Sequence, residues 1–377
     1  MTAPDPTPPR IIHVISSLGV GGAERLLVDL MASLQPHERA SVTVVVMNEA
    51  DPAMLARLAE TGVTVEAWRR TRGSRDPRYL TRLLEIVGPG PAVIHAHNRG
   101  SKFWAMLVRA LRPKARLVFT VHAMNVVARY GRLHRALHNR LVDRTVAISR
   151  AVARECRESG VENVTVIRNG VDLSRFRTPG EPPPACRLER EPGHVPRLVT
   201  VARLVHAIKG QDVLIEAAAH LKAHGIPVHL RIVGSPSPDQ PETPAVLRAL
   251  VARHGLGDQV TFAQGVADAA DEIRHADLCV VPSREEGFGL VILEAMAAGV
   301  PVVASRLDGP AELIMPGLTG ELAEAGNVQD LADRIADLLA DRPRASRMVR
   351  EARAVASAHD IAVMRRAYLD LYRSLAR

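Results

Sequence analysis

Residues 278–305 read LCVVPSREEGFGLVILEAMAAGVPVVAS. Two short valine-rich runs, 278–282 and 301–305, enclose a glycine-containing loop and an apolar segment long enough for a helix. Short apolar runs bounded by turn signals are typical of strands buried on both faces, and a strand, a helix and a strand in succession form the unit of parallel sheets. The stretch therefore predicts an α/β fold in which parallel strands alternate with covering helices.

The same alternation extends along the chain in both directions. Leu26, Leu27, Leu30 and Leu34 repeat at helical spacing, which predicts a helix over Ala23–Leu34. A second helix is expected over Ala362–Leu375, at the end of the chain. We expect strands over 10–16, 41–47, 63–68, 92–96, 116–121, 145–148 and 164–167 in a first sheet, and over 197–202, 229–233, 260–263, 278–282 and 301–305 in a second, complete by about residue 325. The fold class is therefore α/β, with two doubly wound parallel sheets.

The chain of 377 residues is long enough for two domains. A proline-rich stretch with few apolar residues divides it and fits neither a strand nor a helix. We therefore expect an N-terminal domain over 1–178, a linker over 179–196, a C-terminal domain over 197–358, and a terminal helix within 359–377 that could pack back on the first domain.

Composition argues against several classes of protein. Aromatic residues make up only 3%, which leaves few rings to stack on single-stranded nucleic acid, so no nucleic-acid partner is expected. The three cysteines are far apart, which argues against a disulfide framework and a zinc site and fits a reducing cytoplasm. No run of 18 apolar residues occurs, so the sequence predicts no membrane-spanning helix.

The charge is unevenly distributed. Residues 1–180 hold 27 Lys and Arg against 15 Asp and Glu, whereas 181–377 hold 22 against 26. Residues 86–142 contain ten basic residues and no acidic one. Such a segment favours an anionic partner, and we expect it to contact the anionic inner face of the cell membrane, unless its arginines simply cover solvated helices.

Two cations follow the first strand expected in the second sheet. Arg203 comes directly after the strand, and Lys209 lies six residues later, before a helix. Ligands of open parallel sheets bind where strands end, and an arginine fork and a lysine ammonium can together hold a diphosphate. The alternative is two solvated loop cations.

Two carboxylates flank the glycines of the opening stretch. Glu286 precedes Gly287 and Gly289 in the loop, and Glu294 lies on the following helix. A helical path of eight residues spans about 12 Å, so the two groups suit separate parts of one long ligand, a sugar and a ribose diol, better than a glycosidase pair. Both could instead be solvated.

The first half of the chain offers weaker signals. Gly22 lies in a glycine-rich turn before a helix, where free N–H groups suit a phosphate, although a tight turn alone would also need glycine. His122 follows a strand, where it could donate a hydrogen bond to a sugar or serve the structure alone. His95 and His97 lie on one face of a strand, a spacing that metals can use, but no third ligand is evident in the sequence and no metal is expected.

Together these segments resemble the family-4 retaining glycosyltransferases, whose GT-B fold places two Rossmann-like domains on either side of a cleft. The resemblance covers nearly the whole chain. Two segments depart from the family pattern: Ala202 replaces a frequent glycine, and 233–238 is rich in Pro and Ser where a Gly-rich turn is common. The resemblance rests on Gly21-Gly22-Ala23-Glu24, Ala147-Ile148-Ser149, Asn169-Gly170-Val171-Asp172, Arg203, Lys209, and Glu286 separated by seven residues from Glu294.

The resemblance implies roles for these residues. Arg203 and Lys209 would neutralise the departing diphosphate, Glu286 and His122 would face the transferred sugar, and Glu294 would hold the ribose hydroxyls. No metal ion or other cofactor is implied, since fixed cations and helix N-termini can stabilise the departing charge. Backbone contacts to the donor would come from Gly22, Gly265, Val266, Phe288, Gly289 and Leu290.

The implied activity is that of a retaining hexosyltransferase, moving a sugar from a nucleotide-diphosphate donor to a glycan or lipid-linked acceptor. The acceptor would belong to the synthesis of cell-envelope polysaccharide, lipopolysaccharide or glycolipid. We expect a cytoplasmic protein, peripheral on the membrane through 86–142. The alternatives are a nucleotide-sugar epimerase of the same architecture and a non-catalytic protein that binds a nucleotide sugar.

Overall fold

The computed structural model describes residues 9–71, 73–176, 193–237, 240–266 and 268–376. Its contacts divide the chain into two compact units, one of residues 1–170 with 361–377 and one of residues 171–360. Residues 171–176 thus group with the second unit, where the 3-10 helix η1 (Leu173–Phe176) contacts helix α12 (Leu290–Ala298). Most of the linker predicted over 179–196 lies outside the described residues, so that assignment stays a prediction.

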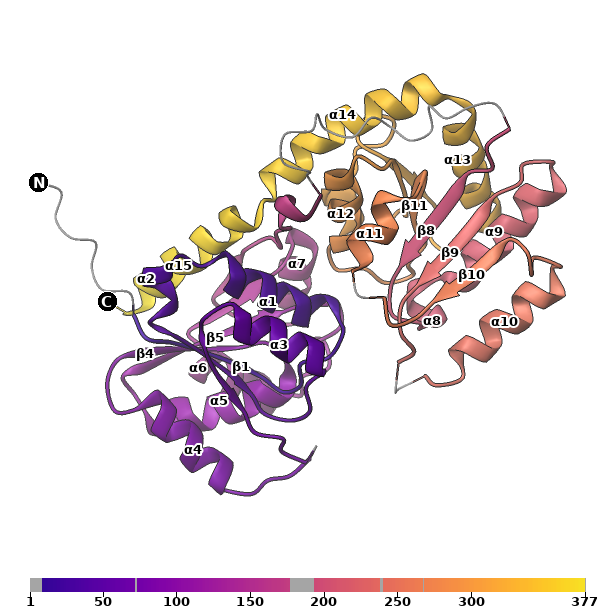
Figure 1. The fold of residues 1–377 in the computed structure, drawn as a ribbon. Coiled ribbons are helices and arrows are strands. Elements are labelled where there is room, and N and C mark those ends of the chain that lie inside the picture. The colour runs from indigo at the N-terminus through magenta and orange to yellow at the C-terminus, as the bar shows by residue number, and fades with distance from the viewer. Residues whose placement is uncertain (1–8, 72, 177–192, 238–239, 267, 377) are drawn as a thin grey trace, which may run out of the picture. The chain divides into compact units, whose positions relative to one another are not determined.

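Unit 1 contains a seven-stranded parallel sheet of order β3-β2-β1-β4-β5-β6-β7 (Figure 1). Strands β1 and β4 are buried throughout, because helices cover both faces of the sheet. The strands are β1 (Ile11–Ile15), β2 (Val42–Val46), β3 (Thr64–Ala67), β4 (Ala92–Ala96), β5 (Ala115–Val121), β6 (Arg144–Ala147) and β7 (Val164–Val166).

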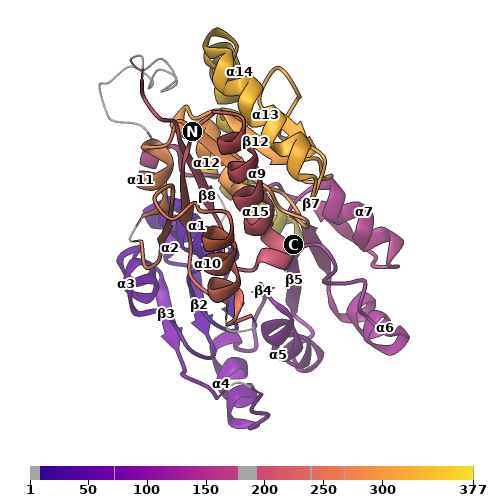
Figure 2. The same ribbon diagram turned by 90° about the vertical axis from the view of Figure 1, so that its right-hand side faces the viewer.

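The helices of unit 1 form two groups. Helix α1 (Gly22–Ser33) contacts α3 (Pro52–Glu60) and the C-terminal helix α15 (Ile361–Ala376), which also contacts β4. Helix α5 (Arg99–Leu111) contacts α4 (Arg78–Val87) and α6 (Arg132–Leu141), as Figure 2 shows from a second side. The remaining helices are α2 (Pro36–Arg39) and α7 (Arg150–Glu158).

A buried amine joins α5 to α6. Lys102 on α5 is 1% exposed, and its Nζ lies 2.5 Å from the Tyr130 hydroxyl, 3.1 Å from His134 Nε2 and 3.3 Å from His138 Nδ1. Burial, reinforced by the charge of Arg99, lowers the pKa of Lys102 to about 7. The packing of α6 therefore places an ionisable amine among neutral partners.

Unit 2 contains a six-stranded parallel sheet of order β10-β9-β8-β11-β12-β13. Its strands agree with the sequence prediction to within one residue, apart from β13, a short edge strand that the sequence did not predict. The strands are β8 (Arg197–Val201), β9 (His229–Val233), β10 (Val260–Ala263), β11 (Leu278–Val281), β12 (Val302–Ser305) and β13 (Glu321–Ala323).

The helices of unit 2 also form two groups. Helix α9 (Gln211–Ala223) contacts α10 (Thr243–Arg253) and α13 (Val328–Ala340), whereas α12 contacts α11 (Ala269–Arg274) and α14 (Arg342–Ala358). A single turn, α8 (His206–Lys209), precedes α9. Among the described residues, no helix is both long and apolar enough to cross a bilayer.

Candidate active site

The order of the strands in unit 2 reverses between β8 and β11. Strand β8 is followed along the chain by β9 on one side, and β11 by β12 on the other, so the loops after β8 and β11 diverge at this point of the sheet. This is where open α/β sheets bind their ligands. The two loops also contact each other, because the N–H of Arg284 donates to the carbonyl of Ile208 over 2.7 Å.

Lys209 and Glu286 meet across these loops. Lys209 Nζ lies 2.8 Å from Glu286 Oε2, and both side chains are mostly but not fully buried. The pair comes from residues 77 positions apart, which the sequence assigned separately to a diphosphate and a sugar. The fold therefore brings a cation and a carboxylate to one point beside the β8–β11 switch.

Glycine permits the close approach of the two loops. Gly210, which ends α8 with a φ of 65°, lies so close to the β11 loop that an added Cβ would be 1.9 Å from the Pro282 carbonyl oxygen. A second glycine that the sequence did not single out, Gly309, packs against the backbone of 286–288, and its Cβ would lie 2.5 Å from the Glu286 carbonyl oxygen. Any side chain at either position would displace the loop that carries Glu286.

Arg203 lies on the same loop as Lys209, but its side chain is exposed. Its carbonyl accepts a hydrogen bond of 2.8 Å from Nε2 of the buried Gln211. Its guanidinium has no partner in the described part of the chain. The structure thus fixes the backbone at Arg203 and leaves the cation accessible.

A second arginine is hydrogen bonded to residues on both sides of Lys209. Arg284 donates to both oxygens of Asp212, over 2.8 and 2.7 Å, and to the carbonyl of His206 over 2.8 Å. Asp212 is in the first turn of α9, and the pairing with Arg284 lowers its pKa against the opposing effect of burial. Sequence reasoning missed this pair because nothing local relates two residues 72 positions apart.

The segment after Glu286 leads into α12. Phe288 is buried, and Gly289 begins the helix with a φ of 103°, without a side chain to cap the first N–H groups. Leu290 and Glu294 are half-buried on the first turns of α12. Burial, with a further contribution from the charge of Glu294, raises the pKa of the Cys279 thiol on β11.

The other predicted donor contacts come from other parts of the chain. Gly265 and Val266 follow β10, two strands from β8 in the sheet. Gly22 and His122 belong to unit 1: Gly22 is exposed at the start of α1, and His122 follows β5.

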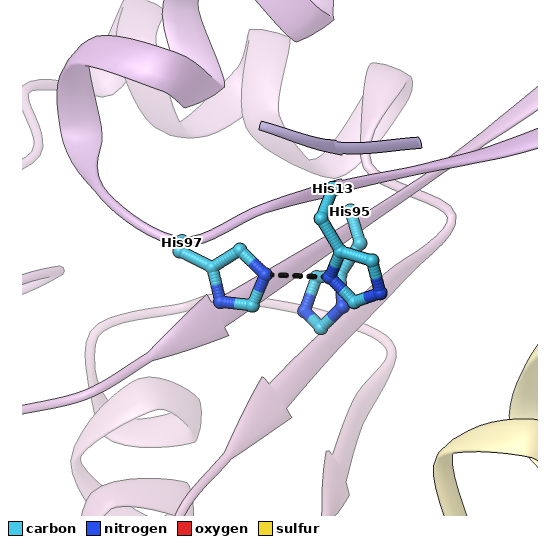
Figure 3. Close-up of side chains that lie close together, drawn as sticks. All are labelled: His13, His95 and His97. Carbon is cyan, nitrogen blue, oxygen red and sulfur yellow. Dashed lines mark hydrogen bonds between the residues drawn. The ribbon is translucent and has the colours of Figure 1, made fainter. Parts of the chain in front are cut away.

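Unit 1 has a cluster of imidazoles on its central strands and the loops after them, of which His13, His95 and His97 are buried (Figure 3). His13 Nδ1 lies 2.9 Å from His97 Nε2, and His97 Nδ1 lies 3.3 Å from His122 Nε2. Burial lowers the pKa of His13 to about 3 and that of His122 to about 4. Burial and neighbouring histidines hold the pKa values of His95 and His97 well below the usual value, so all four rings are neutral near pH 7.

The sequence suggested no third imidazole beside His95 and His97, and this was wrong. Strand β1 pairs with β4 so that His13 lies opposite His95, and ligand nitrogens of the three rings lie within 4.8 Å of one another. However, both nitrogens of His95 already have partners, the Tyr372 hydroxyl at 2.6 Å and the Thr120 hydroxyl at 2.7 Å. A neutral imidazole has one lone pair, so binding a metal would cost His95 one of these hydrogen bonds.

Two family profiles match the chain. The family described as Glycosyltransferase Family 4 matches residues 20–175, and the family described as Glycosyl transferases group 1 matches residues 189–355. The first match falls within unit 1 apart from its last five residues, and the second falls within unit 2.

Curated relatives carry related names. A D-inositol 3-phosphate glycosyltransferase of Thermobispora bispora is 32% identical over 329 residues, covering 78% of this chain and 74% of the relative. That of Nocardia farcinica is 36% identical over 55% of this chain and 47% of the relative. The GDP-mannose-dependent alpha-(1-6)-phosphatidylinositol monomannoside mannosyltransferase of Mycobacterium tuberculosis is 38% identical over 48% of this chain and 47% of the relative. The chain thus spans about half the length of several curated relatives that it matches.

Solved structures share the fold over almost the entire chain. HepE of Anabaena, in complex with UDP-glucose, has a TM-score of 0.82 and 25% identity, covering 97% of this chain and 99% of that one. Sucrose-phosphate synthase of Thermosynechococcus elongatus has a TM-score of 0.76 and 23% identity with the same coverage.

Proposed function

Because this chain belongs to glycosyltransferase family 4 and has the GT-B fold, we propose that it transfers a sugar from a nucleotide-diphosphate donor to a hydroxyl of an acceptor. The observation that carries this proposal is the meeting of Lys209 and Glu286 beside the switch between β8 and β11. A diphosphate with an attached sugar needs a cation and a polar group for the sugar at one point, and the pair supplies both.

We assign the steps of the reaction to residues as follows. Lys209 and the exposed Arg203 bind the diphosphate and stabilise the charge that develops on it as the glycosidic bond breaks. The uncapped N-terminus of α12 adds a partial positive charge at the same loop. Glu286 accepts hydrogen bonds from sugar hydroxyls, and Glu294 accepts them from the ribose.

The finer features of the reaction follow from the same assignment. We propose transfer with retention of the anomeric configuration, in which the leaving diphosphate takes the proton of the acceptor hydroxyl. Lys209 and Arg203 would then take the place of a metal ion in neutralising the diphosphate. Gly265 and Val266 would lie near the base of the nucleotide, and Gly22 would approach the diphosphate from unit 1.

For the acceptor we propose a polyol that carries a phosphate or a phospholipid. The relatives from Thermobispora and Mycobacterium are named for inositol phosphate and for a phosphatidylinositol mannoside, and both acceptors are anionic polyols. Unit 1 carries the excess of basic residues that such an acceptor would favour. These names give no support to lipopolysaccharide synthesis, which stays a prediction from the sequence.

The experiment that tests this function is a thermal-shift screen of nucleotide diphosphate sugars, followed by product analysis with and without acceptors. A donor at 100 times its Kd stabilises the folded protein by about 2.7 kcal/mol, which is a readily measured shift. Lys209→Ala should lose both the shift and the transfer while retaining its circular dichroism spectrum. Stabilisation by a donor without any sugar transfer would indicate a non-catalytic protein that binds a nucleotide sugar. Release of an isomerised sugar without acceptor would indicate an epimerase.

We also propose that unit 1 binds an anionic membrane surface, on the cytoplasmic side, through α5 and α6. Both helices expose large apolar side chains, of which Phe103 is 49% and Leu133 is 74% exposed. They lie within the segment 86–142, which has no acidic residue. Apolar side chains flanked by arginines suit the boundary between headgroups and acyl chains. The exposed apolar residues are Phe103, Leu107, Leu111, Leu133 and Leu137.

Sedimentation with liposomes tests the membrane proposal. Binding to vesicles with anionic lipid should fall as salt rises, because the attraction of the arginines is screened. Leu133→Ser with Leu137→Ser should weaken binding at every salt concentration, whereas the matched pair Val246→Ser with Val363→Ser, exposed elsewhere, should not. Equal binding to neutral and anionic vesicles would refute the proposal that the arginines attract the membrane through its negative charge.

A further inference from the structure

The backbone of Arg203 lies where strand β8 is separating from one of its two neighbours. On one side, the ladder with β9 continues past the end of β8, because Ala202 and Leu204 each donate an N–H to a carbonyl of segment 233–235. The backbone groups of successive residues in a strand point to opposite sides, so those of Arg203 point away from β9. The neighbour on that side, β11, pairs with β8 at residues 198–199, before Arg203. The Arg203 carbonyl therefore faces the side from which β11 diverges.

Gln211 supplies the donor that the sheet does not provide there. Its Nε2 donates to the Arg203 carbonyl over 2.8 Å, and its side chain, on the first residue of α9, is fully buried. On the β9 side, Gly234 permits a close approach, because an added Cβ would lie 1.8 Å from the Ala202 carbonyl oxygen. The backbone around Arg203 is thus held from both sides, by segment 233–235 and by Gln211.

The contact of Gln211 has an energetic cost. Its Oε1 is buried and has no hydrogen-bond partner among the residues that the structure describes. Leaving a buried acceptor unpaired costs at least as much free energy as one hydrogen bond typically contributes, so an apolar side chain of similar length would serve stability equally well. Stability alone therefore does not explain a glutamine at this position.

We propose that Gln211 is a positioning residue that holds the backbone of Arg203, so that the exposed guanidinium is presented to the diphosphate of the donor. The role of Arg203 rests on the function proposed above. An exposed arginine has many accessible conformations, and restricting its backbone before binding reduces the entropy lost when the ligand is held. Because Gln211 is fully buried, it acts through Arg203 and does not itself contact the ligand.

Calorimetry with nucleoside diphosphates tests this inference without any acceptor. The probes are UDP, GDP, ADP and dTDP, and the one that the wild type binds most tightly is used for the variants. Gln211→Met, similar in length but without an amide, should weaken this affinity about fivefold, the effect of one hydrogen bond, while the melting temperature stays equal or rises. Unchanged affinity in a folded Gln211→Met protein would overturn the proposal.

Gln259→Met is the matched control. Gln259 also has a buried Oε1 without a partner in the described part of the chain, but it precedes β10 and so lies at the opposite end of the sheet. This variant should bind the nucleotide as the wild type does. An equal loss of affinity in Gln259→Met would show that removing any such amide from unit 2 weakens binding, and it would overturn the specific role of Gln211.

A double variant separates positioning from a merely structural effect. If Gln211 acts only through Arg203, adding Gln211→Met to Arg203→Ala should cause no further loss of affinity. A further loss would mean that the substitution disturbs another part of the loop, such as Lys209, and would overturn the proposal.

Gln211→Glu gives a second test that does not depend on the folding of the methionine variant. A protonated carboxyl group has an O–H that can donate to the Arg203 carbonyl, whereas an ionised carboxylate can only accept. The affinity of this variant relative to the wild type should therefore fall as the pH rises from about 5 to about 9, the range in which buried glutamates titrate. A constant ratio over this range would overturn the proposal.

The proposed function and this inference fail in different ways. A wild type that binds none of the four nucleotides, or an Arg203→Ala variant with unchanged affinity, would refute the function proposed for this site. If Arg203→Ala weakens binding and a folded Gln211→Met does not, this inference alone is refuted.

Discussion

Replacing Lys102 with methionine should remove a pH dependence of the stability of unit 1. The pKa of Lys102 is lowered to about 7 in the folded protein, mainly by burial, against 10.5 for an ordinary lysine. Between these values the unfolded chain binds a proton that the folded chain does not, so the free energy of unfolding rises with pH. One proton corresponds to about 1.4 kcal/mol per pH unit in the middle of this range. With only 1% of the side chain exposed, solvent screening removes little of this.

Urea unfolding followed by tryptophan fluorescence measures this effect in the relevant unit. The two tryptophans of the chain, Trp68 and Trp104, are both buried in unit 1. Between pH 7.5 and 8.5 the stability of the wild type should gain about 1.4 kcal/mol relative to Lys102→Met. Lys114→Met, at an exposed position, serves as the matched control and should follow the wild type.

Comparing wild type and variant at each pH cancels the other titrating groups. The thiol of Cys156 and the phenol of Tyr368, whose pKa values burial raises to about 12, give the opposite slope at high pH in both proteins. Parallel stability curves for the wild type and Lys102→Met across pH 7.5–8.5 would show that the amine is charged in the folded state and that the reasoning is wrong.

Two further changes test the candidate site in unit 2. Glu294→Gln should weaken nucleotide binding about tenfold, because a neutral amide is a poorer acceptor for ribose hydroxyls, and equal affinity by calorimetry would contradict that role. Gly210→Ala should destabilise unit 2 and lower transfer, because its Cβ would collide with the Pro282 carbonyl; Gly225→Ala is the control, since it has a similar φ of 73° with open space around the Cβ. If both glycine variants lost the same stability, only the backbone conformation would matter, and the close contact of the two loops would not.

Much of the fold could be predicted because the local sequence of most strands already indicates a strand. Valine- and isoleucine-rich runs predicted twelve strands close to their observed bounds. The exception, β13, has the sequence Glu-Leu-Ala, without a β-branched residue, and it forms only because β12 offers an edge to pair with. Local patterns therefore identified the strands that are apolar in themselves and missed the one defined by its neighbour.

The candidate site was predictable to the extent that it follows strand ends. Lys209 and Glu286, which meet in the structure, were singled out because the loops after parallel strands gather at one edge of a sheet. Gly309 and Gln211 were not found. Gly309 packs against the backbone of residues 286–288, and Gln211 donates a hydrogen bond to the carbonyl of Arg203. Such contacts have no spacing rule, and only the folded chain reveals them.

The imidazole cluster of unit 1 shows why the two ends of the sequence must be considered together. His13 lies within an apolar run, where a single polar residue looks like a minor irregularity of a buried strand. Its partner His97 is 84 residues away, and His95 lies within hydrogen-bonding distance of Tyr372, which is 277 residues further along the chain. Burying the three imidazoles of His13, His95 and His97 is costly unless their nitrogens find partners. Strand β1, strand β4 and helix α15 each supply part of that pairing, so the polar interior of unit 1 is satisfied only when the C-terminal helix has returned to it.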